Sequence, residues 1–330
     1  MTIRDTQAVL HVPARDIPVP AHLSPEAQAI LAMGPLPPFD APALDDLAAW
    51  RATIAERDQQ VAAMTAGSAP AVDASIEELD VDGARVFAIT PAGTPATDRR
   101  VYLDIHGGAF ILGGGQLCRD TGRADAARVG SRVWVVDYRM PPDHPYPAAL
   151  DDCVTAYRAL LADHRPDDVV VGGGSAGGNL AAALILRARD EGLPLPAAAL
   201  LLTPAVDLTG AGDSRNTNFG VDTVLTERNS AATTLYVDGH DRAHPYLSPV
   251  YGDFGKGFPP TLLATGTRDL LLSDTVRMHR ALRSAGIPAE LHVLEAAPHG
   301  WFFGHAPEDA ELWAEIRGFV DARWAEGTIS

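Results

Sequence analysis

Short apolar runs alternate with longer amphipathic segments from about residue 75 to the end of the chain. Eight runs have the length and composition of strands: ASIEELDV, ARVFAIT, RVYLDIH, SRVWVVDYR, DVVVGGG, AAALLLTPAV, TLLATGT and AELHVLE. The first two flank Asp82-Gly83, which predicts a hairpin. Apolar spacing typical of helices occurs near residues 117–130, 147–163, 176–190, 273–285 and 308–325. This alternation predicts an α/β fold with a mostly parallel eight-stranded sheet flanked by helices on both faces.

Two regions depart from this alternation of strand and helix patterns. Residues 1–70 hold two helical patterns separated by the proline-rich PLPPFDAP, and two such helices would bury little surface alone. Residues 208–258 are mostly polar loop with a short helical pattern, and they interrupt the chain at the carboxyl edge of the predicted sheet. Long insertions at that edge often form lids. We therefore expect both regions to form a helical cap over a catalytic domain that spans residues 71–330.

Composition narrows the function classes. The 330 residues are 46% hydrophobic and 21% charged, which is typical of a folded protein, and the net charge is -17. Such acidity disfavours nucleic-acid binding and stable association with anionic membranes. The first twenty residues do not resemble a signal peptide, so a cytoplasmic location is expected. Only Cys118 and Cys153 are cysteines, too few for a disulfide framework or a metal cluster.

The stretch VVVGGGSAGGNLA places five glycines around Ser175, between a predicted strand and a predicted helix. Gly173 to Gly177 fits G-x-S-x-G, the sharp turn that lifts a serine hydroxyl above a sheet. Small residues are needed there because neighbouring backbone passes close, and the following helix directs its free N–H groups toward the serine. The same pattern also arises as a plain glycine-rich turn. Ser175 is therefore a candidate nucleophile that requires a base and an acid.

Two later loops supply those partners in the expected chain order. TLLATGTRDLLLSD ends one strand and offers Asp269, with Asp274 as a nearby competitor. AELHVLEAAPHGWFF ends the last strand and offers His299 in the following loop. His292 lies inside that strand, so we interpret it as structural or exposed. A serine needs such a base, held in place by a third group.

Donors for an oxyanion are expected at the end of another strand, in LDIHGGAF. A glycine turn beside a structural histidine is the alternative for this segment alone. It becomes much less favoured once the serine turn, Asp269 and His299 follow in order. The predicted backbone donors are Gly107, Gly108, Ala109 and Ala176. The apolar side chains predicted to wall the substrate pocket are Phe110, Phe219, Leu270 and Trp301.

These motifs resemble the hormone-sensitive-lipase-like branch of the α/β-hydrolases, a branch of bacterial esterases and lipases, from about Val101 to the C-terminus. The family's H-G-G-G appears as HGGA at residues 106–109. Its long D-Y-R block appears as DYRMPPDHPYPAALDD, with Asp143 where glutamate is usual, and it resembles a structural brace. The helical N-terminus suits the family's cap. Two further segments, RDIPVPAHLSPEAQAIL and the one beginning TRDLLLSD, are similar to lactone hydrolases of this branch.

The resemblance implies that Ser175 is the nucleophile, Asp269 the acid and His299 the base, with oxyanion donors at Gly108, Ala109 and Ala176 and with Gly107 adjacent. Two departures bear on the site. Ala109 replaces the third glycine, and its amide is expected to donate if its φ is negative. Gly174 replaces the aspartate of the family's G-D-S-A-G-G, which leaves the three catalytic residues intact and changes the local charge.

The sequence thus predicts a serine carboxylesterase that hydrolyses small to medium esters through an acyl-enzyme, without a metal or an organic cofactor. Its expected partner is a small-molecule ester or lactone, and a homodimer stays open. The alternatives are a lactone hydrolase, a peptidase on the same fold, and a ligand-binding protein that has lost catalysis. The intact Ser175, Asp269 and His299 argue against the last, and nothing resembles the propeller domain that such peptidases often carry.

Overall fold

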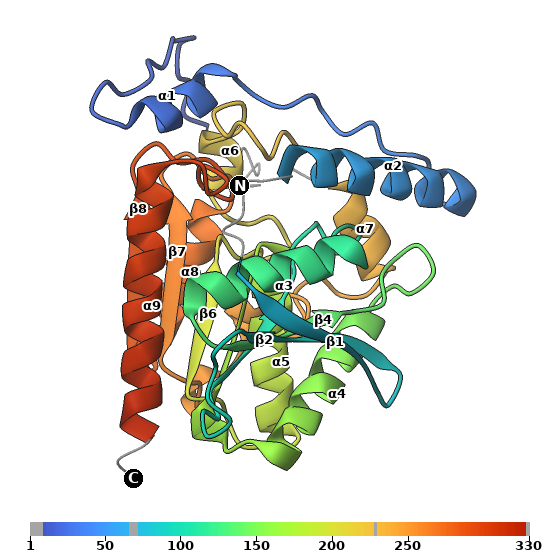
Figure 1. Cartoon of the computed structure of the whole chain (residues 1–330). Helices are drawn as coiled ribbons and strands as arrows, with labels where there is room; N and C mark the ends of the chain where they lie inside the picture. The colour runs from blue at the N-terminus through green and yellow to red at the C-terminus, as the bar shows by residue number, and fades with distance from the viewer. Residues whose placement is uncertain (1–8, 66–71, 228–229, 328–330) are drawn as a thin grey trace, which may run out of the picture.

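The computed structural model describes residues 9–65, 72–227 and 230–327. An eight-stranded sheet with the order β1-β2-β4-β3-β5-β6-β7-β8 forms its centre (Figure 1). β1 and β2 are antiparallel to their neighbours, and the remaining strand pairs are parallel. The strands are β1 (Ala74–Val81), β2 (Ala84–Pro91), β3 (Val101–Ile105), β4 (Arg132–Asp137), β5 (Val169–Gly174), β6 (Ala198–Leu202), β7 (Thr261–Gly266) and β8 (Ala289–Leu294). The predicted mostly parallel eight-stranded sheet is confirmed.

Helices cover both faces of the sheet because the central strands are apolar on both sides. The side chains of Leu103 and Ile105 pack in a cluster with those of α4 and α5, whereas Tyr102 packs in a cluster with those of α3 and α9. Successive strand residues point to opposite faces, which explains this division. The helices are α1 (Pro25–Ala32), α2 (Leu47–Thr65), α3 (Gln116–Val129), α4 (Ala148–Asp163), α5 (Ala176–Asp190), α6 (Ser214–Thr217), α7 (Ala231–Val237), α8 (Leu272–Ser284) and α9 (Pro307–Gly327).

Turn chemistry sets the strand ends. Asp82 and Gly83 have φ values of 49° and 87°, the left-handed pair that a two-residue hairpin prefers, so the predicted hairpin is confirmed. The sixth strand is shorter than its apolar run predicts. It ends at Leu202 because Thr203 has a φ of 43° and Pro204 has no backbone N–H to continue a ladder.

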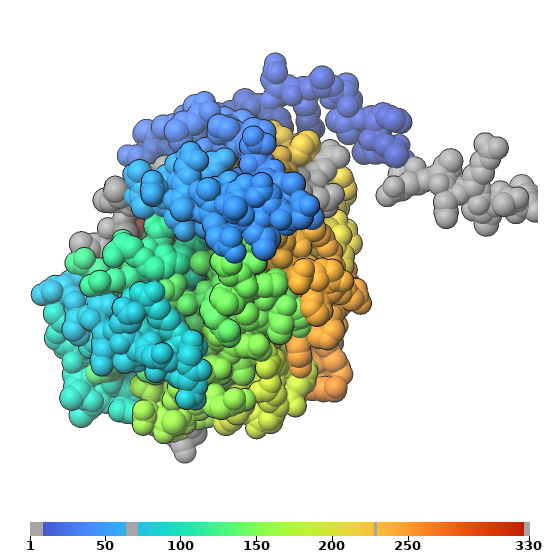
Figure 2. Space-filling model, turned by 90° about the vertical axis from the view of Figure 1, so that its right-hand side faces the viewer, coloured from blue at the N-terminus to red at the C-terminus, as the bar shows by residue number. Residues whose placement is uncertain are grey.

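The N-terminal helices α1 and α2 lie at one end of the molecule, near α6 and α7 of the insertion (Figure 1). Figure 2 shows the N-terminal segment, in blue, as a layer over that end. Trp50 of α2 is fully buried and packs with Ile111 of the loop after β3 and Ala232 of α7. A backbone hydrogen bond from Leu36 to Thr223 joins the same two regions. The N-terminal segment and the insertion therefore meet above the sheet.

The block DYRMPPDHPYPAALDD connects β4 to α4 through hydrogen bonds and an ion pair. Arg139 donates from its backbone and its guanidinium to the buried carboxylate of Asp152. Asp143, in the same block, forms an ion pair with Arg51 of α2 at 2.6 Å. These contacts fit the interpretation of the block as a brace. Among the described residues, no helix is both long enough and apolar enough to cross a membrane.

Candidate active site

The turn between β5 and α5 raises Ser175 above the sheet. Ser175 has φ 55° and ψ -117°, a strained conformation typical of a nucleophile on such a turn. Close backbone approach explains the neighbouring glycines: a Cβ at Gly173 would lie 2.2 Å, and one at Gly177 1.8 Å, from the carbonyl oxygen of Ile105. At Gly174 the nearest atom would be 3.8 Å away. The backbone therefore leaves room for a side chain at Gly174, unlike at Gly173 and Gly177.

Three side chains predicted from separate strand ends meet at this turn. His299 Nε2 lies 2.9 Å from Ser175 Oγ, and His299 Nδ1 lies 3.1 Å from Asp269 Oδ1. Asp269 is fully buried and His299 is 7% exposed, so water hardly competes for these hydrogen bonds. The chain of contacts can carry a proton from the serine hydroxyl to an imidazole that a carboxylate holds in one orientation.

Asp269 has further donors that fix its carboxylate. Thr265 Oγ1 donates to Oδ2 at 2.9 Å, and the amide of Leu271 donates to Oδ1 at 2.8 Å. The competitor Asp274 is buried elsewhere, 3.3 Å from Arg215, and burial raises its pKa to about 7. His292 pairs with a surface glutamate on α9, as expected for a structural or exposed histidine.

Asp222, in the insertion, is a site residue that the sequence patterns did not single out. Its Oδ1 accepts from the amide of His299 at 3.3 Å, and its Oδ2 accepts from the amide of Leu270 at 2.7 Å. Burial lowers the pKa of His299, but the charge and hydrogen bond of Asp269, together with the charge of Asp222, outweigh it and raise that pKa. Asp222 therefore joins the insertion to the loop after β7, which holds Asp269, and to the loop after β8, which holds His299.

The loop after β3 reaches the same site. A Cβ at Gly107 would lie 3.0 Å from the carbonyl oxygen of Gly174, so this loop passes directly beside the serine turn. The condition set for donation by Ala109, a negative φ, is not met: its φ is 53°, because the chain reverses through Gly108 and Phe110, which also have positive φ. Ile111 and Leu112 both donate to the carbonyl of Gly108 and close this turn.

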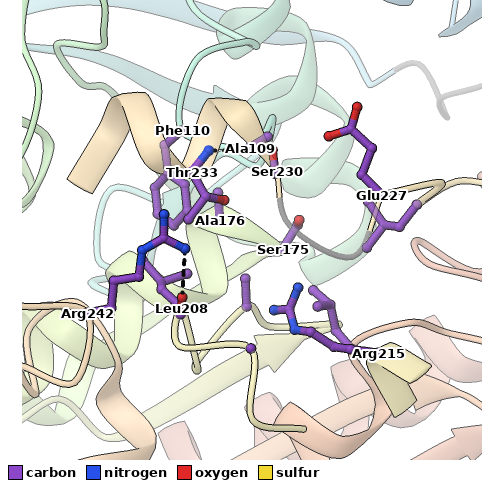
Figure 3. Close-up of a pocket in the computed structure, with 14 residues that line it drawn as sticks. Ala109, Phe110, Ser175, Ala176, Leu208, Arg215, Glu227, Ser230, Thr233 and Arg242 are labelled. Carbon is purple, nitrogen blue, oxygen red and sulfur yellow. Dashed lines mark hydrogen bonds between the residues drawn. The ribbon is translucent and has the colours of Figure 1, made fainter. Parts of the chain in front are cut away.

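Ala176 is the first residue of α5, so its N–H has no acceptor within the helix. Ala176 directly follows Ser175 in the chain, and Ala109 and Ala176 both line a cavity of about 80 Å³ in front of the serine (Figure 3). Figure 3 also shows two arginines, Arg215 and Arg242, reaching the same cavity from the insertion. The oxyanion role of Ala109, Ala176 and their glycine neighbours stays a prediction.

Two of the four predicted pocket walls line a cavity. Phe110 lines the small cavity in front of Ser175, and Trp301 lines a larger cavity that Ser175 also lines. Leu270 is fully buried, and its neighbour Leu271 lines the small cavity instead. Phe219 is 42% exposed, and within the described chain it contributes to neither cavity.

Comparison with known proteins decides the family. A family model described as the alpha/beta hydrolase fold matches residues 102–303, which include the serine turn, Asp269 and His299. This chain belongs to the α/β-hydrolase fold family. Within it, the hydrolase is a bacterial hormone-sensitive-lipase-like enzyme and a carboxylic ester hydrolase, as its relatives indicate.

An acetyl-hydrolase of Streptomyces hygroscopicus is 37% identical over 70% of this chain and 78% of its own length. A carboxylic ester hydrolase of Mycobacterium tuberculosis, LipN, is 33% identical over 84% of this chain and 77% of its own. A crystal structure of an esterase superposes with a TM-score of 0.83 and 34% identity, covering 94% of this chain and 98% of that one. An esterase described as a bacterial hormone-sensitive lipase family member gives 0.75 and 33%, covering 91% and 99%.

The open space at Gly174 gives a prediction about pH. A carboxylate introduced by Gly174→Asp fits sterically beside Ser175, and its charge would stabilise the imidazolium form of His299. Since a general base must be neutral, the acidic limb of kcat/KM should move to higher pH, by up to about one unit. The measurement compares pH profiles of wild type and variant on an uncharged ester at one ionic strength.

Gly174→Asn is the matched control, because asparagine has nearly the same size and no charge. Its acidic limb should coincide with that of the wild type. Coincident limbs for Gly174→Asp and Gly174→Asn would show that charge at position 174 does not tune His299.

Proposed function

We propose that this hydrolase is a serine carboxylesterase that works through Ser175, His299 and Asp269 and an acyl-enzyme. The observation that carries the proposal is the unbroken chain of contacts from Ser175 Oγ through both ring nitrogens of His299 to Asp269. The esterase and acetyl-hydrolase relatives support the same chemistry. The roles of the individual residues rest on geometry and chemistry.

In the first half of the reaction, Ser175 Oγ attacks the ester carbonyl carbon while His299 Nε2 takes its proton. The carbonyl oxygen becomes an oxyanion that we place against the backbone amides of Gly108 and Ala176, with Gly107 adjacent. We leave Ala109 out of this set because its φ is positive. Collapse of this tetrahedral intermediate breaks the ester C–O bond, and His299 returns the proton to the leaving alcohol. Ser175 is left as an acyl ester.

In the second half, a water molecule gives one proton to His299 Nε2 as its oxygen attacks the acyl carbon. The second tetrahedral intermediate expels Ser175 Oγ, which recovers the proton from His299, and the carboxylic acid leaves. Asp269 accepts from His299 Nδ1 throughout and stabilises the imidazolium that forms in each half. The contacts of Asp269 with Thr265 and Leu271 keep its carboxylate oriented for this task.

A substrate panel tests this function. We expect purified protein to hydrolyse p-nitrophenyl acetate, butyrate and hexanoate, and to lose this activity after treatment with a fluorophosphonate. A parallel set of aliphatic lactones of matched carbon number distinguishes a carboxylesterase from the alternative, a lactone hydrolase. Higher kcat/KM on the lactones would replace the proposed substrate class, and no turnover of either set would overturn the proposal.

We also propose that residues 1–70 and the 208–258 insertion act as one cap that shapes the substrate site. The buried cluster of Trp50, Ile111 and Ala232 supports this role. It joins α2 and α7 to the loop after β3, which we call the oxyanion loop because it carries the proposed oxyanion donors. Asp58 of α2 also accepts a hydrogen bond from the amide of Gly113 at 2.9 Å, in the same loop. Movement of α2 would therefore shift the oxyanion loop.

Trp50→Ala tests the cap. Removing a fully buried tryptophan should cost roughly 3–5 kcal/mol of local packing, and the loss falls between the cap and the oxyanion loop. We expect a lower melting temperature and a changed acyl-chain preference in kcat/KM. Leu47→Ala, on an exposed position of the same helix, is the control and should change neither. A folded Trp50→Ala variant with unchanged chain-length preference would contradict the proposed role.

A further inference from the structure

The cavity in front of Ser175 contains two cations that the proposed mechanism does not use. Arg215 of α6 and Arg242, in the loop after α7, line this cavity together with Ser175. Figure 3 shows both guanidinium groups reaching into it from the insertion. The chain as a whole has a net charge of -17, so two arginines in a cavity of about 80 Å³ reverse the charge locally.

Arg215 is held in place and still has donors for a ligand. Its Nη2 donates to the carbonyl of Asp207 at 3.2 Å and to Asp274 Oδ2 at 3.3 Å, and these are its hydrogen bonds within the described part of the chain. A guanidinium has five N–H donors, so those residues leave both donors of Nη1 unused. The side chain is 14% exposed, and the cavity is one of the spaces it faces.

The two acids near Arg215 balance its charge only in part. Burial raises the pKa of Asp274 to about 7, so near neutral pH this carboxyl is partly protonated. Asp207 offers Arg215 only a backbone carbonyl, because its carboxylate pairs with Arg277 of α8. Burial and, to a smaller extent, the charge of Arg215 oppose the rise in the pKa of His299 described above. Positive charge therefore remains within electrostatic range of the catalytic base.

Arg242 is fixed by neutral groups of the cap. Its Nη1 donates to the carbonyl of Leu208 at 3.3 Å, and its Nη2 donates to Thr234 Oγ1 at 2.8 Å. Glu227 is the only acid among the described residues that line the cavity. Figure 3 shows its carboxylate turned away from both arginines. The cavity thus presents two positioned cations without an acid between them.

We infer that this cavity receives a carboxylate of the substrate, and that the hydrolase prefers esters that carry a carboxylate on a short arm. Arg215 and Arg242 are the specificity-determining residues. A carboxylate only accepts hydrogen bonds, and its two oxygens match the fork of a guanidinium. The apolar side chains of Leu208 and Leu225 line the same cavity and can pack against the methylene groups of the arm.

The volume of about 80 Å³ limits the arm to a few carbon atoms. The inference rests on the proposed esterase function and adds a substrate class to it.

The test compares two pairs of esters in which a carboxamide of nearly the same size replaces the carboxylate. The first pair is monomethyl glutarate and its half amide, with the charge on the acyl arm. The second is γ-acetoxybutyrate and γ-acetoxybutyramide, with the charge on the alcohol arm. Acid release is followed in a pH-stat. We expect the wild type to prefer the carboxylate member of one pair by at least about tenfold in kcat/KM, the scale of a charge-assisted hydrogen bond.

Variants of the two arginines assign the preference. Arg215→Gln and Arg242→Gln should each reduce it, the double variant should abolish it, and Arg242→Lys, which keeps the charge, should retain part of it. The ratio within one variant cancels general losses of activity. Arg215→Gln also removes the partner of the buried Asp274, so Arg242→Gln, whose partners are neutral, keeps the test open if Arg215→Gln does not fold.

Arg277→Gln is the matched control. Arg277 also pairs with a buried acid, Asp207, but it does not line the cavity, so this variant should keep the ratio. An equal loss of preference in Arg277→Gln would overturn the inference, because it would assign the effect to the disturbed contacts of Asp207.

Equal kcat/KM for both members of each pair in the wild type would also overturn the inference, as would an unchanged ratio in both Arg215→Gln and Arg242→Gln. A preference for the ω-ammonium analogues would do the same and would indicate that Glu227 sets the charge of the cavity. In each of these cases the neutral esters are still hydrolysed, so the proposed function stands. Failure of that function would appear differently, as undiminished hydrolysis by a Ser175→Ala variant.

Discussion

Ser175→Ala is expected to lower kcat for ester hydrolysis by about a million-fold, to the level left by binding and the oxyanion donors. The reason is that alanine removes the hydroxyl that lies 2.9 Å from His299 Nε2. The backbone should be unaffected, because the Ser175 amide keeps its 2.8 Å hydrogen bond to Leu202. Steady-state hydrolysis of p-nitrophenyl butyrate and a thermal melt measure the two effects.

His299→Ala should cost about as much, because the serine and its base act as one unit. The double variant should then lose little more than either single variant. Additive losses, or near-normal turnover by purified Ser175→Ala, would mean that the hydroxyl and the imidazole do not form a catalytic unit.

Asp269→Asn is expected to lower kcat by about ten-thousand-fold. Asparagine keeps the size of the side chain, but its amide nitrogen cannot accept from His299 Nδ1 and favours the wrong tautomer of the imidazole. The charge that stabilises the imidazolium also disappears. The measurement is kcat on an uncharged ester, at a pH where the wild type is fully active.

Asp274→Asn is the matched control, because Asp274 is an equally buried carboxyl only five residues along the chain. Its pKa is raised to about 7, so it is partly protonated near neutral pH, and asparagine imitates that neutral form. We expect a change in kcat of less than about tenfold, because the asparagine oxygen can still accept from Arg215 and from the amide of Asp207. A large loss of kcat in Asp274→Asn, together with a small loss in Asp269→Asn, would show that Asp274 is the catalytic carboxylate.

Local pattern was enough to predict the sheet and the meeting of the three catalytic candidates. Each strand is a short apolar run, and Asp269 and His299 follow strands whose carboxyl ends share one edge of the sheet with the serine turn. Asp222 could not be found in this way. Its partners lie 48 and 77 residues away, in loops that only the folded chain brings together. No periodicity or motif marks such a residue in a polar insertion.

Asp104, a buried acid in the middle of β3, did leave a signal in the sequence. An acid in the middle of the apolar run VYLDI is unusual, since carboxylates are seldom fully buried without a partner. The partner, Asp125, comes from the next helix and is itself an acid, which pairwise charge rules would not suggest. The positive φ of Ala109 was hidden for a different reason: it follows from how Gly108 and Phe110 reverse the chain, and alanine alone gives no indication of it.

Covalent labelling can show whether Ser175 is the nucleophile of an acyl-enzyme. The hydrolase is treated with a fluorophosphonate in small increments, and residual activity is followed together with the mass of the peptide that contains Ser175. We expect one label per chain, on Ser175, with activity falling in proportion to labelling. Complete inactivation with Ser175 unlabelled, or full labelling of Ser175 with activity retained, would contradict it.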